Sequence, residues 1–446
     1  MRHLVLPCLL FALLAPVWAE SAAEAKSELT IEEAVRIALD RYPEVGKAKA
    51  AADILKGRIR EVRAQALPEV NINSNYTRWR DPSLLNASGL DKFPEELRRA
   101  LVPTPVNLFD YAVTVKQPLY TAGKVGTALR LASIEAEGAT SDIDRAQQDL
   151  AVAVVRAAYD LLMAERLRGL VAETQEQRRR QLEIARTRYR NGVATEVDVL
   201  RSEVAVANVT PELVRAENGI RQARALVNFY LVRPIEFPTR VRGDFQEQQW
   251  DQTDLDALTT EAFRRRPELV RLRISERSAA AQLDLAKAEN RLRLDFNANY
   301  GIMSRLPENL ADPTYARWTA GVNFTFPVFD GFKRSGLVWQ ATANQRAARL
   351  EREKVEQQIR LGLQQGLDEI TAARETITAA RANQNQAERV VSMMEDNYKY
   401  GAATTLDVLE AQNALTLARM NLLRGLRDYS VARASLKWTI GANPWE

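Results

Sequence analysis

The acidic side chains that could do chemistry lie in a motif that the chain contains twice. Residues 188–200 read RYRNGVATEVDVL, and residues 397–409 read NYKYGAATTLDVL, 209 positions later. The residues that the copies share include Tyr189, Gly192, Thr195, Asp198 and Leu200 in the first copy, which match Tyr398, Gly401, Thr404, Asp407 and Leu409 in the second. Glu410 follows Asp407 by three positions, so one helix face carries both carboxylates. Carboxylates alone can perform acid–base catalysis, as they do in glycosidases.

The rest of the composition argues against catalysis. Residues 1–19 read MRHLVLPCLLFALLAPVWA, with the basic start, apolar run and small-residue end of a secretory signal peptide. They contain the only His and the only Cys of the chain. The mature protein is then expected to have no imidazole and no thiol for acid–base work, zinc binding or nucleophilic attack. We therefore expect no enzymatic activity, no cofactor and no metal site.

The charges indicate neither a nucleic-acid ligand nor a helical membrane anchor. The formal net charge is only +4, from 62 basic and 58 acidic residues, although the pI is near 9.1. Both signs interleave along the chain, which is typical of solvated helix faces rather than of a nucleic-acid-binding patch. After residue 19, no apolar stretch approaches the ~20 residues that a transmembrane helix needs.

The motif is part of a repeat that covers most of the chain. Residues 118–120 correspond to 327–329 at the same spacing of 209, whereas residues 43–45 correspond to 267–269 at a spacing of 224. The first copy therefore contains 15 additional residues between these two markers. We expect a first structural repeat at 20–231, an inter-repeat segment at 232–254, a second repeat at 255–440 and a C-terminal tail at 441–446.

Each repeat is expected to contain a very long helical hairpin. Proline is absent between Pro118 and Pro211 and between Pro327 and Pro444, and such stretches, rich in Ala, Leu, Arg and Glu, favour helix. Small and apolar residues recur every seven positions, as in a coiled coil, at Ile143, Leu150, Ala157, Ala164 and Val171. The predicted hairpins span 122–231 and 331–438. Pro211 is expected to kink the first return helix.

The repeated motif is expected to reverse each hairpin. Gly192 and Gly401 can adopt the left-handed conformation that ends a helix. The Thr and Asp that follow, three positions apart, form a capping-box pattern for the next helix. Shorter helices are predicted near 30–41 and 254–265, and each is followed by an Ala-rich helix, near 44–66 and 267–291.

Between the short and the long helices the hydrophobic period changes to two, which predicts four strands, at 69–79, 108–118, 293–303 and 316–327. Each has an apolar, aromatic face and an Asn/Thr-rich face, and each is about as long as a membrane-spanning strand. One interpretation is a half-buried soluble sheet on the helices. The favoured one is the wall of a membrane barrel. Four strands cannot close in lipid, but three chains would supply twelve.

In their order and repeat spacing, these features resemble the TolC-like outer-membrane efflux protein family, over roughly 28–440. The resemblance implies a mainly α-helical fold with a β-barrel part: a homotrimer with a 12-stranded barrel in outer-membrane lipid and a helical tunnel across the periplasm. An equatorial layer would include the short helices, 232–254 and the C-terminus. The resemblance also implies export, driven by an inner-membrane transporter that is joined through a periplasmic adaptor protein.

The resemblance places the repeated motif at the periplasmic mouth of the tunnel. It assigns gate or selectivity roles to Asp198, Asp407, Glu410, Tyr398 and Tyr189, and turn and adaptor-contact roles to Gly192, Thr195, Gly401 and Thr404. Capping explains both Asp residues equally well. Some family members have an Arg in the second turn, where this chain has Ala402-Ala403-Thr404. Arg190 or Lys399 could supply the missing cation.

Two functions therefore remain to be distinguished. The first is an outer-membrane export duct of a tripartite efflux pump or a type I secretion system. The second is a non-catalytic periplasmic coiled-coil structural protein with a soluble sheet. A heat-resistant trimer extracted only by detergent would favour the duct, whereas a soluble periplasmic monomer would exclude it.

Overall fold

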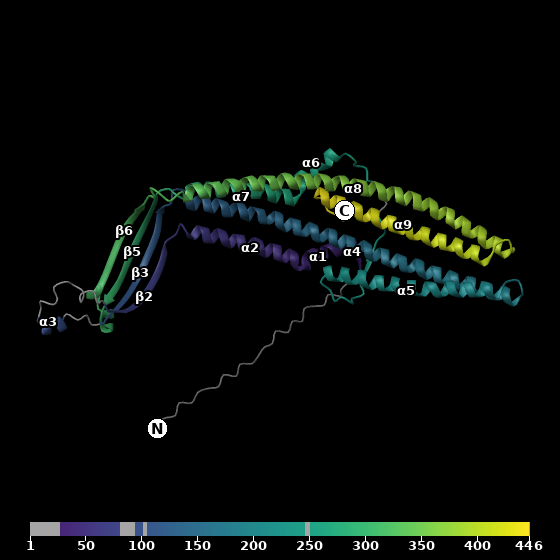
Figure 1. The fold of residues 1–446 in the computed structure, drawn as a ribbon, viewed down its shortest axis with the longest axis horizontal. Helices are drawn as coiled ribbons and strands as arrows, with labels where there is room; N and C mark the ends of the chain where they lie inside the picture. Colours follow the sequence, from purple (N-terminus) through teal and green to yellow (C-terminus); the bar gives the residue numbers. More distant parts are fainter. Residues whose placement is uncertain (1–26, 81–93, 101–104, 246–249, 446) are drawn as a thin grey trace, which may run out of the picture.

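The computed structural model describes residues 27–80, 94–100, 105–245 and 250–445 of the 446-residue chain. A four-stranded sheet forms one end of the elongated molecule, and helices extend from it to the other end (Figure 1). Four helices, α2, α4, α7 and α8, lie side by side next to the sheet, and α5 and α9 continue to the far end (Figure 1). The predicted signal peptide, residues 1–19, lies outside the described residues.

Two helices of identical length dominate the fold. Helix α4 spans Lys124–Arg190 and helix α8 spans Lys333–Lys399, and each contains 67 residues. At ~1.5 Å per residue, each is on the order of 100 Å long. Their return helices are α5, Glu196–Tyr230, and α9, Thr405–Ile440. Helix α5 continues through Pro211. The mainly helical fold with two long hairpins is therefore as predicted.

In each repeat, a short helix and then a longer one precede the strands. Helices α1, Ile31–Arg41, and α2, Pro43–Ala64, correspond to α6, Leu255–Arg265, and α7, Pro267–Ala288. The predicted capping box of α1 is present, because Thr30 Oγ1 accepts from the Glu33 N–H at 3.2 Å. Proline is the first residue of both α2 and α7. It suits this position because proline has no backbone N–H, and the N–H of a first helical residue would have no partner within the helix.

The sheet is antiparallel with the strand order β2-β3-β5-β6. Its strands are β2, Glu69–Trp79; β3, Val106–Tyr120; β5, Arg293–Ser304; and β6, Ala316–Thr325. The four predicted strands are therefore present, with small differences at their ends. The loop after β2 contains a short helix that the sequence pattern did not predict, α3, Glu95–Ala100, and its remainder lies partly outside the described residues.

Two apolar cores lie where the hairpins meet the shorter elements. The first packs the middle of α4, with Leu161 and Val154 fully buried, against α1 and the segment after α5. Strand β1, Glu28–Thr30, pairs there in parallel with β4, Arg240–Arg242, from the predicted inter-repeat segment. The second core packs α6 and α7 against α8 and α9, with Leu363 and Leu436 fully buried. The division into repeats, inter-repeat segment and tail remains a prediction.

Candidate functional site

The first hairpin tip is a helix end followed immediately by a helix start. Gly192 has a φ of +72°, and the Val193 N–H donates to the Arg188 carbonyl at 2.9 Å, so the last turn of α4 is closed. Thr195 then caps α5: its Oγ1 accepts from the Asp198 N–H at 3.3 Å, while Asp198 accepts from the Thr195 N–H at 3.0 Å. The predicted capping box is therefore present.

The second tip repeats this geometry. Gly401 has a φ of +79°, and the Ala402 N–H donates to the Asn397 carbonyl at 2.8 Å. The Thr404 side chain accepts from the Asp407 N–H at 3.3 Å, and Asp407 accepts from the Thr404 N–H at 2.7 Å. The same backbone requirement, reversal of a helix within a few residues, explains the Gly, Thr and Asp in both copies.

Both tip aspartates are held in the charged form. The Thr404 N–H and hydroxyl donate to Asp407 and hold the pKa of its carboxyl below the usual range. Burial raises the pKa of Asp198, but hydrogen bonds from Thr195 and from Thr405 of the other tip outweigh that effect and lower the pKa overall. Asp198 therefore has one role within its own turn and a second contact to α9 of the other hairpin.

The two tip tyrosines occupy different environments. Tyr189 is half exposed, whereas Tyr398 is only 6 % exposed. The Tyr398 hydroxyl lies 3.2 Å from Thr405 Oγ1, the first residue of α9. The duplicated motif thus contains one tyrosine on the surface and one that is packed inside the tip.

Arg188, a residue that the sequence analysis did not select, joins the first hairpin to the second. Its guanidinium carbon lies 4.5 Å from the centre of the Tyr398 ring, and its Nη1 donates to the Tyr398 carbonyl at 2.6 Å. A guanidinium over an aromatic face is attracted by the ring quadrupole, and more strongly when it is partly desolvated. Arg188 therefore attaches the end of α4 to the end of α8.

A second arginine connects the hairpins about three turns farther from the tip. Arg178 is 3 % exposed, and its guanidinium donates to Gln412 Oε1 at 2.7 Å and to Asn413 Oδ1 at 2.6 Å. Gln412 in turn donates to Glu395 at 3.0 Å, so the network joins α4, α9 and α8. Burial lowers the pKa of Arg178, and the nearby Glu212 carboxylate partly offsets this shift.

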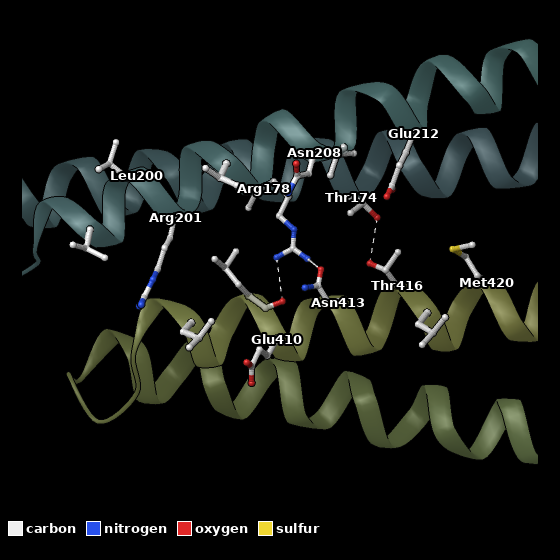
Figure 2. A pocket seen from close by; sticks show the side chains of 17 residues that line it. Thr174, Arg178, Leu200, Arg201, Asn208, Glu212, Glu410, Asn413, Thr416 and Met420 are labelled. Carbon is white, nitrogen blue, oxygen red and sulfur yellow. Dashed lines mark hydrogen bonds between the residues drawn. The ribbon is translucent and has the colours of Figure 1, made fainter.

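A cavity of about 690 Å³ lies between α5 and α9 next to this network (Figure 2). Glu410 lines it from α9, and Arg201 and Glu212 line it from α5. Several apolar side chains in its wall, including Leu200 and Leu417, are more than half exposed. The cavity therefore combines carboxylates and guanidinium groups with an accessible apolar surface.

The heptad pattern could have identified both arginines. Arg178 is the next position after Val171 in the seven-residue series, and Arg188 continues a second series of the same spacing through Leu167, Thr174 and Gln181. The seam of α4 thus changes from small and apolar to polar over its last two heptads. Arg190 and Lys399, the cations that the sequence suggested, pair in a single chain with Glu183 and Asp396 on their own helices, and their role at the mouth stays a prediction.

Two further observations concern the described part of the chain. Among its helices, none is both long enough and apolar enough to cross a membrane. Within the same residues, no group of three or more His, Cys, Asp or Glu side chains is arranged to hold a metal ion.

Two long helical hairpins, related by an internal repeat, extend from a four-stranded sheet and end in capped tips at the far end of the molecule. This arrangement defines a class of outer-membrane export channels. The chain belongs to the family described as outer membrane efflux protein, which matches residues 34–231 and 258–442. The match falls in two segments, separated by residues 232–257.

Curated relatives and solved structures agree with this assignment. The outer membrane protein TolC of Vibrio cholerae is 25 % identical over 433 residues, which cover 95 % of this chain and 91 % of the relative. TolC of Escherichia coli K12 is 21 % identical over 439 residues, covering 94 % and 83 %. The crystal structure of the Campylobacter jejuni CmeC outer membrane channel has the same fold, with a TM-score of 0.79 at 15 % identity over 92 % of this chain and 85 % of that one.

The function predicted from the sequence is thereby confirmed at the level of the class. The chain is an outer-membrane exit channel for efflux and secretion, located in the bacterial outer membrane and extending into the periplasm. Its family consists of transport proteins rather than enzymes.

Proposed function

We propose that three copies of the chain form one continuous duct, with a 12-stranded barrel in the outer membrane and a helical tunnel in the periplasm. The observation that carries this proposal is the sheet order β2-β3-β5-β6, in which β2 and β6 each have one edge without a partner strand among the described residues. Unpaired backbone groups are not tolerated in lipid, so a membrane-embedded sheet of this kind requires partners at both edges.

The side chains of the sheet support a position in lipid. On β6, Trp318, Val322 and Phe324 alternate with polar or small residues, and all three are more than half exposed. Ile72 of β2 is 82 % exposed. Apolar and aromatic side chains exposed on alternate positions are expected where one face of a barrel contacts hydrocarbon and the other contacts water.

The helical tips are the proposed mouth of the tunnel. Asp198, Asp407 and Glu410, contributed by three chains, would form rings of negative charge that favour cations. Tyr398 and Tyr189 would be gate residues, Tyr398 through its contact with Arg188. The turns around Gly192, Thr195, Gly401 and Thr404 would contact a periplasmic adaptor protein, which joins the duct to an inner-membrane transporter that supplies the energy for export.

The assembly can be tested on detergent extracts of outer membranes. We expect an oligomer with the mass of three chains that resists dissociation in SDS without boiling and that opens ion-conducting channels in planar bilayers. A soluble monomer in the periplasmic fraction would contradict the proposal and would instead favour the structural coiled-coil protein.

A further inference from the structure

Four helices next to the sheet form a row in the order α2, α4, α7, α8 (Figure 1). Helix α4 packs against α2 and α7, and α7 packs against α4 and α8, so α2 and α8 are the outer members of the row. A duct of several chains, as proposed above, requires the outer helix of one chain to meet the outer helix of the next. The internal repeat indicates which residues meet there.

The two spacings found in the sequence hold in three dimensions. Helices α4 and α8 have equal length and start 209 residues apart, at Lys124 and Lys333. Helices α2 and α7 both have 22 residues and start 224 residues apart, at Pro43 and Pro267. Strand pairing follows the same rule, because Glu69 pairs with Lys116 and the equivalent Arg293 pairs with Thr325. The contact between α4 and α7 should therefore recur between α8 and α2 of another chain.

The α4–α7 contact is held by a series of ion pairs in antiparallel order. The three pairs farthest from the sheet, with their N···O distances, are Glu137–Arg277 at 2.9 Å, Asp142–Arg271 at 3.1 Å and Arg145–Glu268 at 3.7 Å. Two further pairs, Arg130–Asp284 and Lys124–Glu289, lie nearer the sheet and have no oppositely charged equivalents on α8 and α2. In the three pairs farthest from the sheet, the charges along α4 are negative, negative and positive, and those along α7 are the reverse. A pattern of this kind matches in one register and brings like charges together in others.

Each of these three ion pairs has an equivalent on the outer helices. Adding 209 to the number of the α4 residue gives its equivalent on α8, and subtracting 224 from the number of the α7 residue gives its equivalent on α2, which would belong to a second chain. The three results are Arg346 with Asp53, Glu351 with Lys47, and Lys354 with Glu44. All three combine opposite charges, although the first has exchanged its signs relative to Glu137–Arg277. We propose that α8 of one chain lies antiparallel to α2 of a second copy of this chain, joined by these three ion pairs.

The charged side chains of α2 and α8 are exposed in the single chain, which supports their contact with a second copy. Glu44 pairs with Lys47, and Glu351 with Lys354, within their own helices, and these four side chains are 51–71 % exposed. Each helix thus presents a positive and a negative group, three positions apart, in the order that complements the other helix.

Positions next to the proposed ion pairs are buried in the α4–α7 contact, whereas the equivalent positions on α8 and α2 carry exposed apolar residues. Ser141 of α4 and Ser278 of α7 are buried, at 6 % and 8 % exposure. The equivalent positions on the outer helices are Leu350, at 53 %, and Ile54, at 72 %. Large apolar side chains at positions that are buried in the other repeat indicate a surface covered in the assembly.

The same conversion predicts the strand register at the closure of the sheet. Val113 of β3 pairs with Tyr300 of β5. The equivalent residues are Val322 of β6 and Tyr76 of β2, so these two should be partners across the boundary between chains. Helices and strands therefore give one consistent alignment of the neighbouring copies.

Cysteine cross-linking tests the register on the full-length chain. The only cysteine, Cys8, lies in the predicted signal peptide, so introduced cysteines are unique in the mature protein. We expect Lys47→Cys combined with Glu351→Cys, treated with a short bifunctional maleimide, to give covalent dimers and trimers after boiling. Lys47→Cys with Glu353→Cys is the matched control, because position 353 lies on another face of α8. Asp142→Cys with Arg271→Cys should link within one chain and leave its mass unchanged.

Charge exchange provides an independent test. Lys47→Glu alone and Glu351→Lys alone each bring like charges together, so both should lower the fraction of heat-resistant trimer, and their combination should restore it. Trimers in which the matched pair cross-links no better than the control pair, or in which the double variant is not restored, would overturn the register while the trimeric duct stands. Absence of any oligomer in the unmodified protein would overturn both.

Discussion

Arg188 of the first hairpin lies with its guanidinium carbon 4.5 Å from the ring centre of Tyr398 in the second hairpin and donates to the same residue's backbone carbonyl. The contact joins the ends of the two longest helices. This pair, the Arg178 network and the contact of Asp198 with Thr405 are among the described contacts that join the two tips.

Replacing Arg188 by Ala should loosen the second tip. The ring contact and a hydrogen bond from a charged donor together contribute about 2 kcal/mol to the closed tip. Backbone amides of 397–409 should then exchange hydrogen about thirtyfold faster, since ~1.4 kcal/mol corresponds to a factor of ten. Arg190→Ala is the control, because Arg190 contacts Glu183 and Thr187 on the exposed surface of its own helix, where such contacts contribute little. Equal exchange in both variants would contradict the role of Arg188.

Replacing Arg178 by Met should open the seam between α4 and α9. The substitution leaves Oε1 of the buried Gln412 without its donor, which costs about 2–3 kcal/mol. We expect faster first cleavage by trypsin at the exposed tip residue Lys399. Arg179→Met removes one arginine at an exposed neighbouring position and should leave this rate unchanged. Combining Arg178→Met with Gln412→Leu should cost less than the sum of the single changes, because the two residues share one network.

Acid should fray both tips through their aspartates. The folded pKa of Asp407 and of Asp198 lies below the ordinary value of 3.8. Their stabilisation is therefore fully present above about pH 3.8 and disappears as the pH falls through the lower folded pKa. Asp407→Asn keeps a capping group but no charge, so amide exchange of the second tip in this variant and in the unmodified protein should converge at low pH. A difference that persists unchanged to pH 2 would show that the charge of Asp407 is irrelevant.

Neutralising the second tip tests the gate. Asp407→Asn combined with Glu410→Gln should raise the conductance of the trimer in planar bilayers or weaken its preference for cations, because two rings of charge are removed. Asp396→Asn, which removes an exposed acid paired with Lys399 on α8, is the matched control. Unchanged conductance and ion preference would leave Asp407 with its capping role alone.

Gly301 should be required for the pairing of β3 with β5. A Cβ atom at this position would lie 2.1 Å from the Tyr111 carbonyl oxygen and 2.7 Å from Ala112 Cα, both backbone atoms. Gly301→Ala should therefore separate the strands and reduce heat-resistant trimer strongly. Gly321→Ala, where no atom lies within 4 Å, should be tolerated. Normal trimer from the Gly301 variant would show that the strands can shift to accept the methyl group.

The local structure was largely predictable from the sequence. Proline positions, the seven-residue pattern and the alternating strands depend on neighbours in the chain, so they located the hairpins and the four strands within a few residues. The capping role of Thr195 and Thr404 was predictable for the same reason, because a helix reversal needs a left-handed residue and then an N-cap.

Contacts between hairpins could be established only from the tertiary structure. The sequence analysis did not select Arg178 or Arg188, and nothing in the sequence shows that they bind Gln412, Asn413 and Tyr398, more than 200 positions away. It likewise did not show that Tyr398 is buried while Tyr189 is exposed. A periodic pattern defines which face of a helix is apolar, whereas the partner of that face depends on how the helices pack.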